Sequence, residues 1–517
     1  MRAPKASLLL FPILSGALVL SPLVATGEGP VFPTERTDLS PKDRKRVEGV
    51  TRPTADFSRA ENFETMQGGA ATTKAIVNGD AFSHFSANLT FAEEEEFKLG
   101  NALFRKLWVS SPSSTQASDG LGPLFNARAC QSCHLKDGRG HPPEGSADAT
   151  SMFLRLARPA RTEQEAALVA RHEALNFPDI TYGKQLQDLA IPGLRSEGAM
   201  AISYEEIPVT LADGEVVSLR KPSYSVRDLN YGPLEPDVTL SPRIAPPMIG
   251  MGLIQAIHEA DILAKADPDD ADGDGISGKP ALVRDHRTQE LKLGRFGFKA
   301  QNASIRDQSA SAFVGDLGIS NPDAPFHHGD CTTAQADCLA RPSGVQERLG
   351  TTEAPDPVLE LVTFYAENLA VPARREPGDV KVLKGKELFY RAGCTSCHTP
   401  KFVTRRDAEN KAHAFQLIWP YSDFLLHDMG SEIMGVGLND NFKSGLAMGN
   451  EWRTTPLWGI GLQQIVNGHT YFLHDGRARN LTEAIMWHGG EGEASKNKFK
   501  NMNKEQRRQL IKFVESL

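Results

Sequence analysis

Two copies of one short cysteine–histidine pattern carry most of the chemistry available to this chain. The pattern is C-x-x-C-H, and it occurs at 130–134 and again at 394–398. Two thiols at this spacing can each add to one vinyl group of a porphyrin, and the histidine that follows can coordinate the iron. The sequence therefore predicts two covalently attached haem c groups. The predicted haem-binding residues are Cys130, Cys133 and His134 in the first copy and Cys394, Cys397 and His398 in the second, with His134 and His398 as iron ligands.

Redox dithiols and half zinc sites are the alternative readings of these cysteines. Neither alternative explains why a histidine follows the second cysteine in both copies. The two patterns also use four of the six cysteines in the chain. Haem attachment accounts for both observations at once.

The N-terminus has the features of an export signal. Arg2 and Lys5 precede an uncharged apolar stretch at 6–25, with small residues near its end. The alternative is an uncleaved membrane anchor, because the stretch is close to the roughly 18–20 residues that span a bilayer. Haem c is attached outside the bacterial cytoplasm, so we expect a periplasmic protein without a membrane segment after cleavage.

The other two cysteines and the net charge fit this expectation. Cys331 and Cys338 lie close together in the chain, and we expect them to form a small-loop disulfide in an oxidising compartment. The formal net charge of −8 argues against nucleic acid as a partner. It is compatible with a basic electron-donor protein.

The distance between the two patterns predicts two haem domains. Cys394 follows Cys130 by 264 residues, too far for one cytochrome domain of roughly 100 residues. A helical apolar period precedes each pattern, at 97–108 and at 383–393, which indicates a distant duplication. The predicted divisions are a signal peptide at 1–25, an extended N-terminal arm at 26–85, an N-terminal cytochrome c-like domain at 86–370, a linker at 371–378 and a C-terminal cytochrome c-like domain at 379–517.

The segment between the two patterns contains additional elements. Alternating residues predict strands at 207–211 and 216–219, with a hairpin turn at 212–214. An amphipathic helix is expected at 253–265. We therefore predict a mainly α fold of two cytochrome c-like haem domains, with long loops and a small β-containing insertion at about 145–290.

Three strings in the C-terminal half resemble a known family. They are LHDMG at 426–430, EWRTTPLWG at 451–459 and YFLHDGRARNLTEAI at 471–485. The last is similar to a segment of the bacterial dihaem cytochrome c peroxidases and of the methylamine-dehydrogenase maturation enzymes. Together the strings resemble the di-haem oxidoreductase family, sometimes labelled thiol oxidoreductases, over roughly 90–517.

The resemblance implies a direction of electron flow. The C-terminal haem would take electrons from a donor protein, such as a small cytochrome or a cupredoxin. It would pass them to an N-terminal haem that reacts with peroxide, or that acts on a protein substrate. Two other functions stay open: a non-enzymatic electron-transfer cytochrome, and an oxidase of a protein or thiol partner.

The resemblance also points to a second ligand for the C-terminal haem. In the related proteins the residue at this place in the segment after the last string supplies the sixth ligand, and the matching position here is His488. Met486, two residues earlier, is the rival. A histidine pair gives a lower reduction potential than a histidine–methionine pair.

For the N-terminal haem, the segments at 293–301 and 304–308 resemble those that bring a glutamine and an acidic residue over the iron. The matching residues are Gln301 and Asp307, with Gln308 as the alternative to Asp307. Such a group can take a proton from bound peroxide and return it to the departing oxygen.

One departure from the family pattern concerns the resting iron. Relatives have a histidine about sixteen residues after the first haem histidine, and this chain has Thr150 there. The nearest candidate, His141, is much closer to the motif, and we interpret it as a neighbour of the haem rather than a ligand. The N-terminal iron is therefore expected to be open without reductive activation.

A weaker signal is a candidate calcium loop. Asp270, Asp272 and Asp274 precede Gly275 with the spacing of the first half of a calcium-binding loop. Position 12 of that loop would be Ala281, where a glutamate belongs. A solvated acidic turn is the alternative.

Overall fold

The computed structural model describes residues 32–74, 76–116, 118–143, 150–431 and 436–517. The predicted signal peptide at 1–25 lies outside the described residues. Residues Pro33–Leu517 form one structural unit. The division of this unit into two cytochrome domains stays a prediction. In the described part, no helix combines the length and the apolar character needed to cross a membrane.

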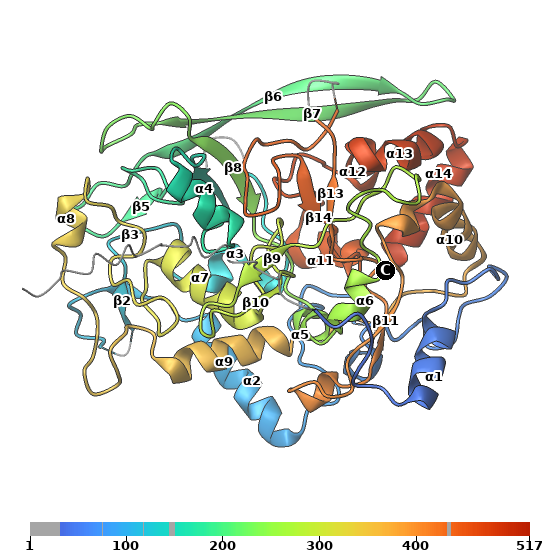
Figure 1. Cartoon of the computed structure of the whole chain (residues 1–517), viewed down its shortest axis with the longest axis horizontal. Helices are drawn as coiled ribbons and strands as arrows, with labels where there is room; N and C mark the ends of the chain where they lie inside the picture. The colour runs from blue at the N-terminus through green and yellow to red at the C-terminus, as the bar shows by residue number, and fades with distance from the viewer. Residues whose placement is uncertain (1–31, 75, 117, 144–149, 432–435) are drawn as a thin grey trace, which may run out of the picture. The chain divides into compact units, whose positions relative to one another are not determined.

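The helices and strands are joined by long loops (Figure 1). The α-helices are α1 Pro41–Thr51, α2 Phe91–Phe104, α3 Cys130–Cys133, α4 Glu163–Ala170, α5 Met251–Gln255, α6 Glu259–Leu263, α7 Ile305–Leu317, α8 Ala336–Leu339, α9 Asp356–Glu367, α10 Val380–Ala392, α11 Gln463–Asn467, α12 Leu481–Met486, α13 Glu493–Lys500 and α14 Lys504–Ser516. The strands are β1 Val109–Ser110, β2 Asp119–Leu121, β3 Leu124–Phe125, β4 Met152–Ala157, β5 Leu189–Ala190, β6 Ala199–Thr210, β7 Val216–Arg227, β8 Thr239–Ile244, β9 Leu282–Arg284, β10 Leu291–Leu293, β11 Phe402–Val403, β12 Leu417–Ile418, β13 Leu426–Asp428 and β14 Glu451–Arg453.

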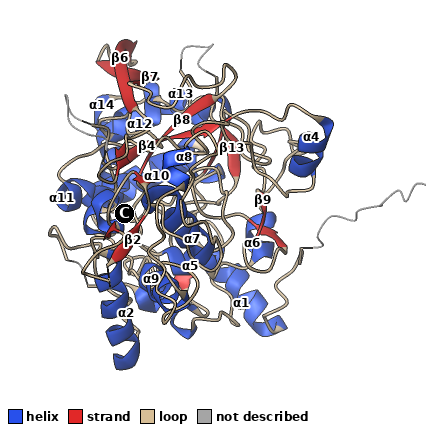
Figure 2. Cartoon of the chain, turned by 90° about the vertical axis from the view of Figure 1, so that its left-hand side faces the viewer, coloured by secondary structure: helices blue, strands red, loops and turns tan. Residues whose placement is uncertain are grey.

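The prediction of a mainly α fold is wrong. Only 29% of the chain is helical and 17% is strand, and the described strands pair into seven two-stranded sheets (Figure 2). Most of these strands have two or three residues. Pairs this short satisfy backbone hydrogen bonds where loops meet, and they leave no alternating pattern in the sequence from which to predict them.

The longest strands form the predicted hairpin. Strands β6 and β7 pair antiparallel from Ala199↔Arg227 to Thr210↔Val216, which confirms the turn at 212–214 but makes both strands longer than expected. Near the turn, Leu211 and Leu219 are buried in the same hydrophobic cluster as helices α10 and α14. The hairpin therefore connects the insertion to the C-terminal half, as the two long green strands of Figure 1 show.

Two large hydrophobic clusters form the core, one around each C-x-x-C-H pattern. The first contains residues of α2, α5, α7 and α9, and the second contains residues of α10, α12, α13 and α14. The helices predicted before the two patterns are confirmed as α2 and α10. Helix α10 ends at Ala392, and the next residue, Gly393, with a φ of 86°, turns the chain directly into Cys394.

Two further segments differ from the sequence expectations. The helix expected at 253–265 is broken into α5 and α6, because the His258 side chain accepts a hydrogen bond from the backbone N–H of Ala260 (3.2 Å) and begins a new helix. The segment predicted to be an extended N-terminal arm contains helix α1. Glu64, later in the same segment, is buried and forms an ion pair with the equally buried Lys386 (2.7 Å from Oε1 to Nζ).

Candidate haem sites

Each C-x-x-C-H pattern opens into its own cavity. The N-terminal cavity is the one lined by Cys130, Cys133 and His134. The C-terminal cavity is the one lined by Cys394, Cys397 and His398. Apolar side chains form most of both walls, which suits the flat hydrophobic face of a porphyrin.

In the N-terminal cavity the chain fixes the orientation of one imidazole. Cys130 and Cys133 are the two ends of the single turn α3, and His134 follows at its C-terminus. The Nδ1–H of His134 donates to the carbonyl oxygen of Pro246 (2.9 Å), which leaves Nε2 for iron. Burial lowers the pKa of His134 to about 4, so the ring is in the neutral form that coordinates metal.

One face of helix α7 forms another part of this cavity. Ile305, Gln308, Ala312 and Asp316 line it, with the spacing of three and four residues that places side chains on one helical face. The carboxylate of Asp316 accepts a hydrogen bond from Nε2 of Gln185 (2.9 Å). Burial raises the pKa of Asp316, although that hydrogen bond opposes the shift.

The two predicted catalytic residues are not among those that line the N-terminal cavity. Oε1 of Gln301 accepts a hydrogen bond from the backbone N–H of Lys299 (3.2 Å). Asp307 is in the first turn of α7, and its carboxylate accepts from the backbone N–H of His286 (3.1 Å). The structure brings Gln308 into the cavity instead, together with Asp316, which sequence reasoning missed. Asp316 follows Gln308 by eight residues, or about two helical turns, and this spacing could have predicted that both side chains lie on one face of the helix.

His141 is also not among the residues that line either cavity. Its Nδ1–H donates to the carbonyl oxygen of Pro142 (2.7 Å), and its ring lies 5.1 Å from that of His469.

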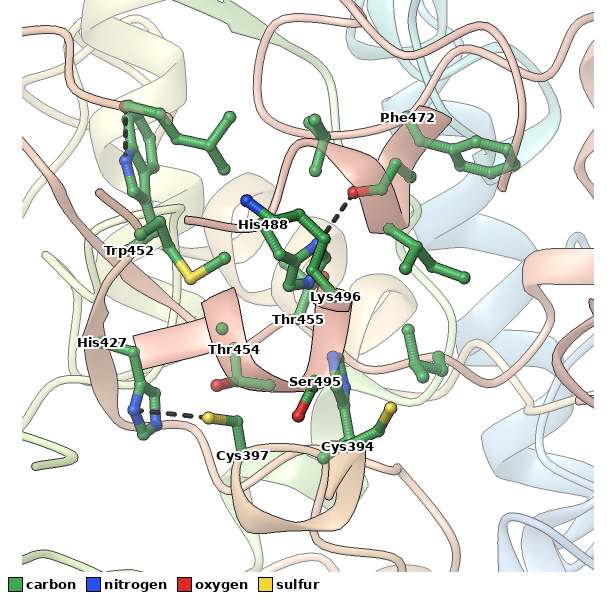
Figure 3. Close-up of a pocket in the computed structure, with 18 of the residues that line it drawn as sticks. Cys394, Cys397, His427, Trp452, Thr454, Thr455, Phe472, His488, Ser495 and Lys496 are labelled. Atoms are coloured by element: carbon green, nitrogen blue, oxygen red, sulfur yellow. Dashed lines mark hydrogen bonds between the residues drawn. The ribbon is translucent and has the colours of Figure 1, made fainter. Parts of the chain in front are cut away.

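In the C-terminal cavity two histidines line the same space. The Nδ1–H of His398 donates to the carbonyl oxygen of Tyr421 (2.9 Å), and that of His488 donates to Ala484 (2.8 Å). Both arrangements leave Nε2 available, and burial lowers the pKa of both rings. Figure 3 shows His488 across the cavity from Cys394 and Cys397. Met486 is buried and is not among the lining residues.

Arg139, Arg453 and Thr455 line both cavities. Burial lowers the pKa of each arginine to about 10, and neither forms a salt bridge within the described residues. Among the described residues, Nε of Arg139 has no hydrogen-bond partner. The same holds for the two ring nitrogens of the buried His474, which lines the C-terminal cavity. Unpaired buried polar groups are costly, and haem propionates would accept hydrogen bonds from the N–H groups among them. The residues present therefore fit two haems.

His427 is held beside the second pattern by two carboxylates. Its Nε2 lies 2.8 Å from Asp423 and its Nδ1 lies 2.6 Å from Glu491. Although burial alone lowers its pKa, the two carboxylates raise the pKa of His427 well above its usual range. Its Nδ1 also lies 3.5 Å from Sγ of Cys397 (Figure 3), so a positive charge lies next to the predicted attachment point of the second haem.

The candidate calcium loop is only partly assembled. Asp270 and Asp272 have carboxylate oxygens close to one of Asp267, a residue that the sequence pattern did not include. Asp274 is not in this group, and its carboxylate accepts from the backbone N–H of Ile276 (2.8 Å). Calcium at this loop stays a prediction.

The sequence matches a protein family whose name indicates two haems, in agreement with the two cavities. The model of the family described as "Di-haem oxidoreductase, putative peroxidase" matches residues 62–517. No curated protein gives a match. The family match confirms the resemblance that the sequence strings indicated, and its name supports two haems. Because it covers most of the chain, this protein belongs to the family of di-haem, peroxidase-like oxidoreductases.

Proposed function

We propose that this protein is a periplasmic dihaem c-type peroxidase that uses its N-terminal haem to react with peroxide. The observation that carries the proposal is the difference between the two cavities. The C-terminal cavity has a histidine on each side, His398 and His488, whereas the N-terminal cavity sets Gln308 and Asp316 of α7 in its wall in addition to His134. A six-coordinate iron suits electron transfer, whereas an iron with a free coordination position suits reaction with peroxide.

The N-terminal cavity can move the proton that peroxide cleavage requires. Cys130, Cys133 and His134 would hold the haem, which would supply the iron chemistry of peroxide reduction. The carboxylate of Asp316 can take a proton from the bound peroxide and return it to the oxygen that leaves as water. Its raised pKa makes it a better base and acid near neutral pH than an ordinary carboxylate. The amide of Gln308, on the same helical face, can orient the peroxide by hydrogen bonding.

The shared wall supports electron transfer between the two sites. Arg139 and Arg453 line both cavities, and neither forms a salt bridge within the described residues. We infer that they hold propionates of both haems against one wall, which would keep the two haem edges close. Electrons would enter at the C-terminal haem from a small cytochrome or a cupredoxin.

The proposal also includes thioether attachment of the haems, export and calcium binding. Thioether attachment follows from the paired cysteines that line each cavity. Export is supported by the sequence at 1–25 and by the disulfide between Cys331 and Cys338, which the structure contains as predicted. Calcium binding is supported by the carboxylate group of Asp267, Asp270 and Asp272.

Spectroscopy of the resting protein tests the function. We expect a high-spin EPR signal from the N-terminal iron, cyanide binding without prior reduction, and oxidation of the protein by two electrons on addition of peroxide. Two low-spin six-coordinate irons that ignore peroxide, even when the protein is half reduced, would instead indicate an electron carrier.

Replacing His488 with Met should raise the reduction potential of the C-terminal haem and keep it low-spin. The thioether stabilises Fe(II) more than imidazole does, so the direction follows from the ligand change. A redox titration followed by visible spectra measures both properties. The comparison variant is Met486→Ala, which should alter neither; if it alters both while His488→Met alters neither, the ligand is Met486.

A further inference from the structure

Two cationic side chains contact the ring of Trp452 beside the C-terminal cavity. Its indole lines that cavity and is buried, and its Nε1–H donates to the carbonyl oxygen of Leu438 (2.7 Å). The ammonium group of Lys299 lies 4.0 Å from the ring centroid, and the guanidinium carbon of Arg243 lies 4.5 Å from it. Figure 3 shows Trp452 at the edge of the cavity.

Both cations are buried, and within the described residues Asp440 forms a salt bridge with each of them. Lys299 is 2% exposed and Arg243 is 7% exposed. Asp440 lies 3.1 Å from Arg243 and 3.7 Å from Lys299. The Nζ of Lys299 donates to the backbone carbonyls of Met448, Gly449 and Glu451. Glu451 also acts electrostatically on Lys299, and Asp475 on Arg243. The two cations, however, are the charged groups that lie over the indole ring.

The other ring neighbour adds no charge. The imidazole of His474 stacks on Trp452 with ring centroids 3.8 Å apart and planes at 17°. Burial lowers the pKa of His474 to about 3, so the ring is neutral. Lys299 and Arg243 are thus the charged side chains in direct contact with this ring within the described residues.

We propose that Lys299 and Arg243 keep Trp452 reduced when peroxide oxidises the haems. The inference rests on the proposed function. Oxidation of the indole would transfer one electron to the oxidised haem pair and leave an indole cation radical. That new positive charge would lie within 5 Å of two cations in a buried, weakly screened site. The neutral indole, by contrast, is stabilised by both cation–π contacts.

The chain contains an internal comparison. Trp458 lines the N-terminal cavity and is also buried. Within the described residues, no cation–π contact involves its ring, whereas Trp452 has two. If either of these indoles is oxidised in the native protein, it should be Trp458. The cations would then retain oxidising equivalents on the haems and protect the wall of the C-terminal cavity.

The test compares oxidation of Trp452 in the native protein and in Lys299→Met and Arg243→Met. Each holoprotein is treated with peroxide at pH 6, below the pKa of about 7 to which burial lowers Lys299. Freeze-quench EPR detects the radical, and peptide mass spectrometry locates oxygenated tryptophan. We expect about tenfold or more oxidation at Trp452 when either cation is removed, and native behaviour in Lys299→Arg.

The matched control is Lys106→Met. Lys106 lies 3.7 Å from the ring of Trp108, which is not among the lining residues of either cavity, so its removal should leave Trp452 unchanged. Haem content and the Soret band confirm that each variant is folded. Equal oxidation of Trp452 in the native protein and both methionine variants would overturn the proposal, as would a Trp452 radical in the native protein, which would make this residue a relay.

A second oxidant separates this proposal from the proposed function. A photogenerated ruthenium(III) polypyridyl complex oxidises the protein without peroxide. If peroxide leaves the haem spectra unchanged, the peroxidase proposal fails. The photochemical comparison of the same variants then still supports or overturns the effect of the two cations on Trp452.

Discussion

Replacing Asp316 with Asn lowers the rate of reaction with peroxide by about 10²–10⁴-fold and leaves both haems bound. The amide cannot take a proton from peroxide and return it to the leaving oxygen, which is the role that we assign to this carboxyl group. Its side chain is nearly the same size, so the face of α7 in the N-terminal cavity should keep its shape. Stopped-flow absorption in the Soret region measures the rate, and pyridine haemochrome titration measures haem content.

The pH dependence provides a second readout for Asp316. As a base it must be deprotonated, so the rate should fall as the pH drops through its pKa. Because burial raises that pKa, the fall should begin at a higher pH than for an ordinary carboxyl group, and Asp316→Asn should abolish this limb of the profile. The matched control is Asp307→Asn, on the same helix but not among the cavity-lining residues. A slow Asp307→Asn and a fast Asp316→Asn would restore the sequence-based assignment.

Removing the thiols of one C-x-x-C-H pattern should reduce the haem content from two per chain to one. Cys130→Ala with Cys133→Ala removes the attachment of the first haem, and Cys394→Ala with Cys397→Ala removes that of the second. Each covalent haem requires its own pair of thiols, because each thiol bonds to one vinyl group. Pyridine haemochrome titration counts the haems that survive acid extraction.

The third pair of cysteines is the control for this experiment. Replacing Cys331 and Cys338, which form a disulfide, should leave two haems per chain. The two haem variants should also differ from each other. The variant that lacks Cys130 and Cys133 should keep the low-spin spectrum expected for an iron bound by His398 and His488. The variant that lacks Cys394 and Cys397 should keep the high-spin spectrum expected for the N-terminal haem. Two covalent haems in either variant would contradict the assignment of these cysteines as the attachment sites.

Local patterns of the chain determined which residues we expect to bind the haems. In C-x-x-C-H every participant lies within five consecutive residues, so the pattern contains the whole attachment site. The helices α2 and α10, the turn of the β6–β7 hairpin and the Cys331–Cys338 disulfide were predictable for the same reason, since each depends on residues close in sequence.

The tertiary structure decided which residues share a cavity. Asp316 rather than Asp307 lines the N-terminal cavity because packing sets the rotation of α7, and one residue along a helix turns a side chain by about 100°. Arg139 and Arg453 come from opposite halves of the chain, yet they line both cavities. Some of the short strand pairs, such as β3 with β5, likewise join segments that lie far apart in the sequence. Such contacts depend on how the whole chain packs, and no local period or spacing records them.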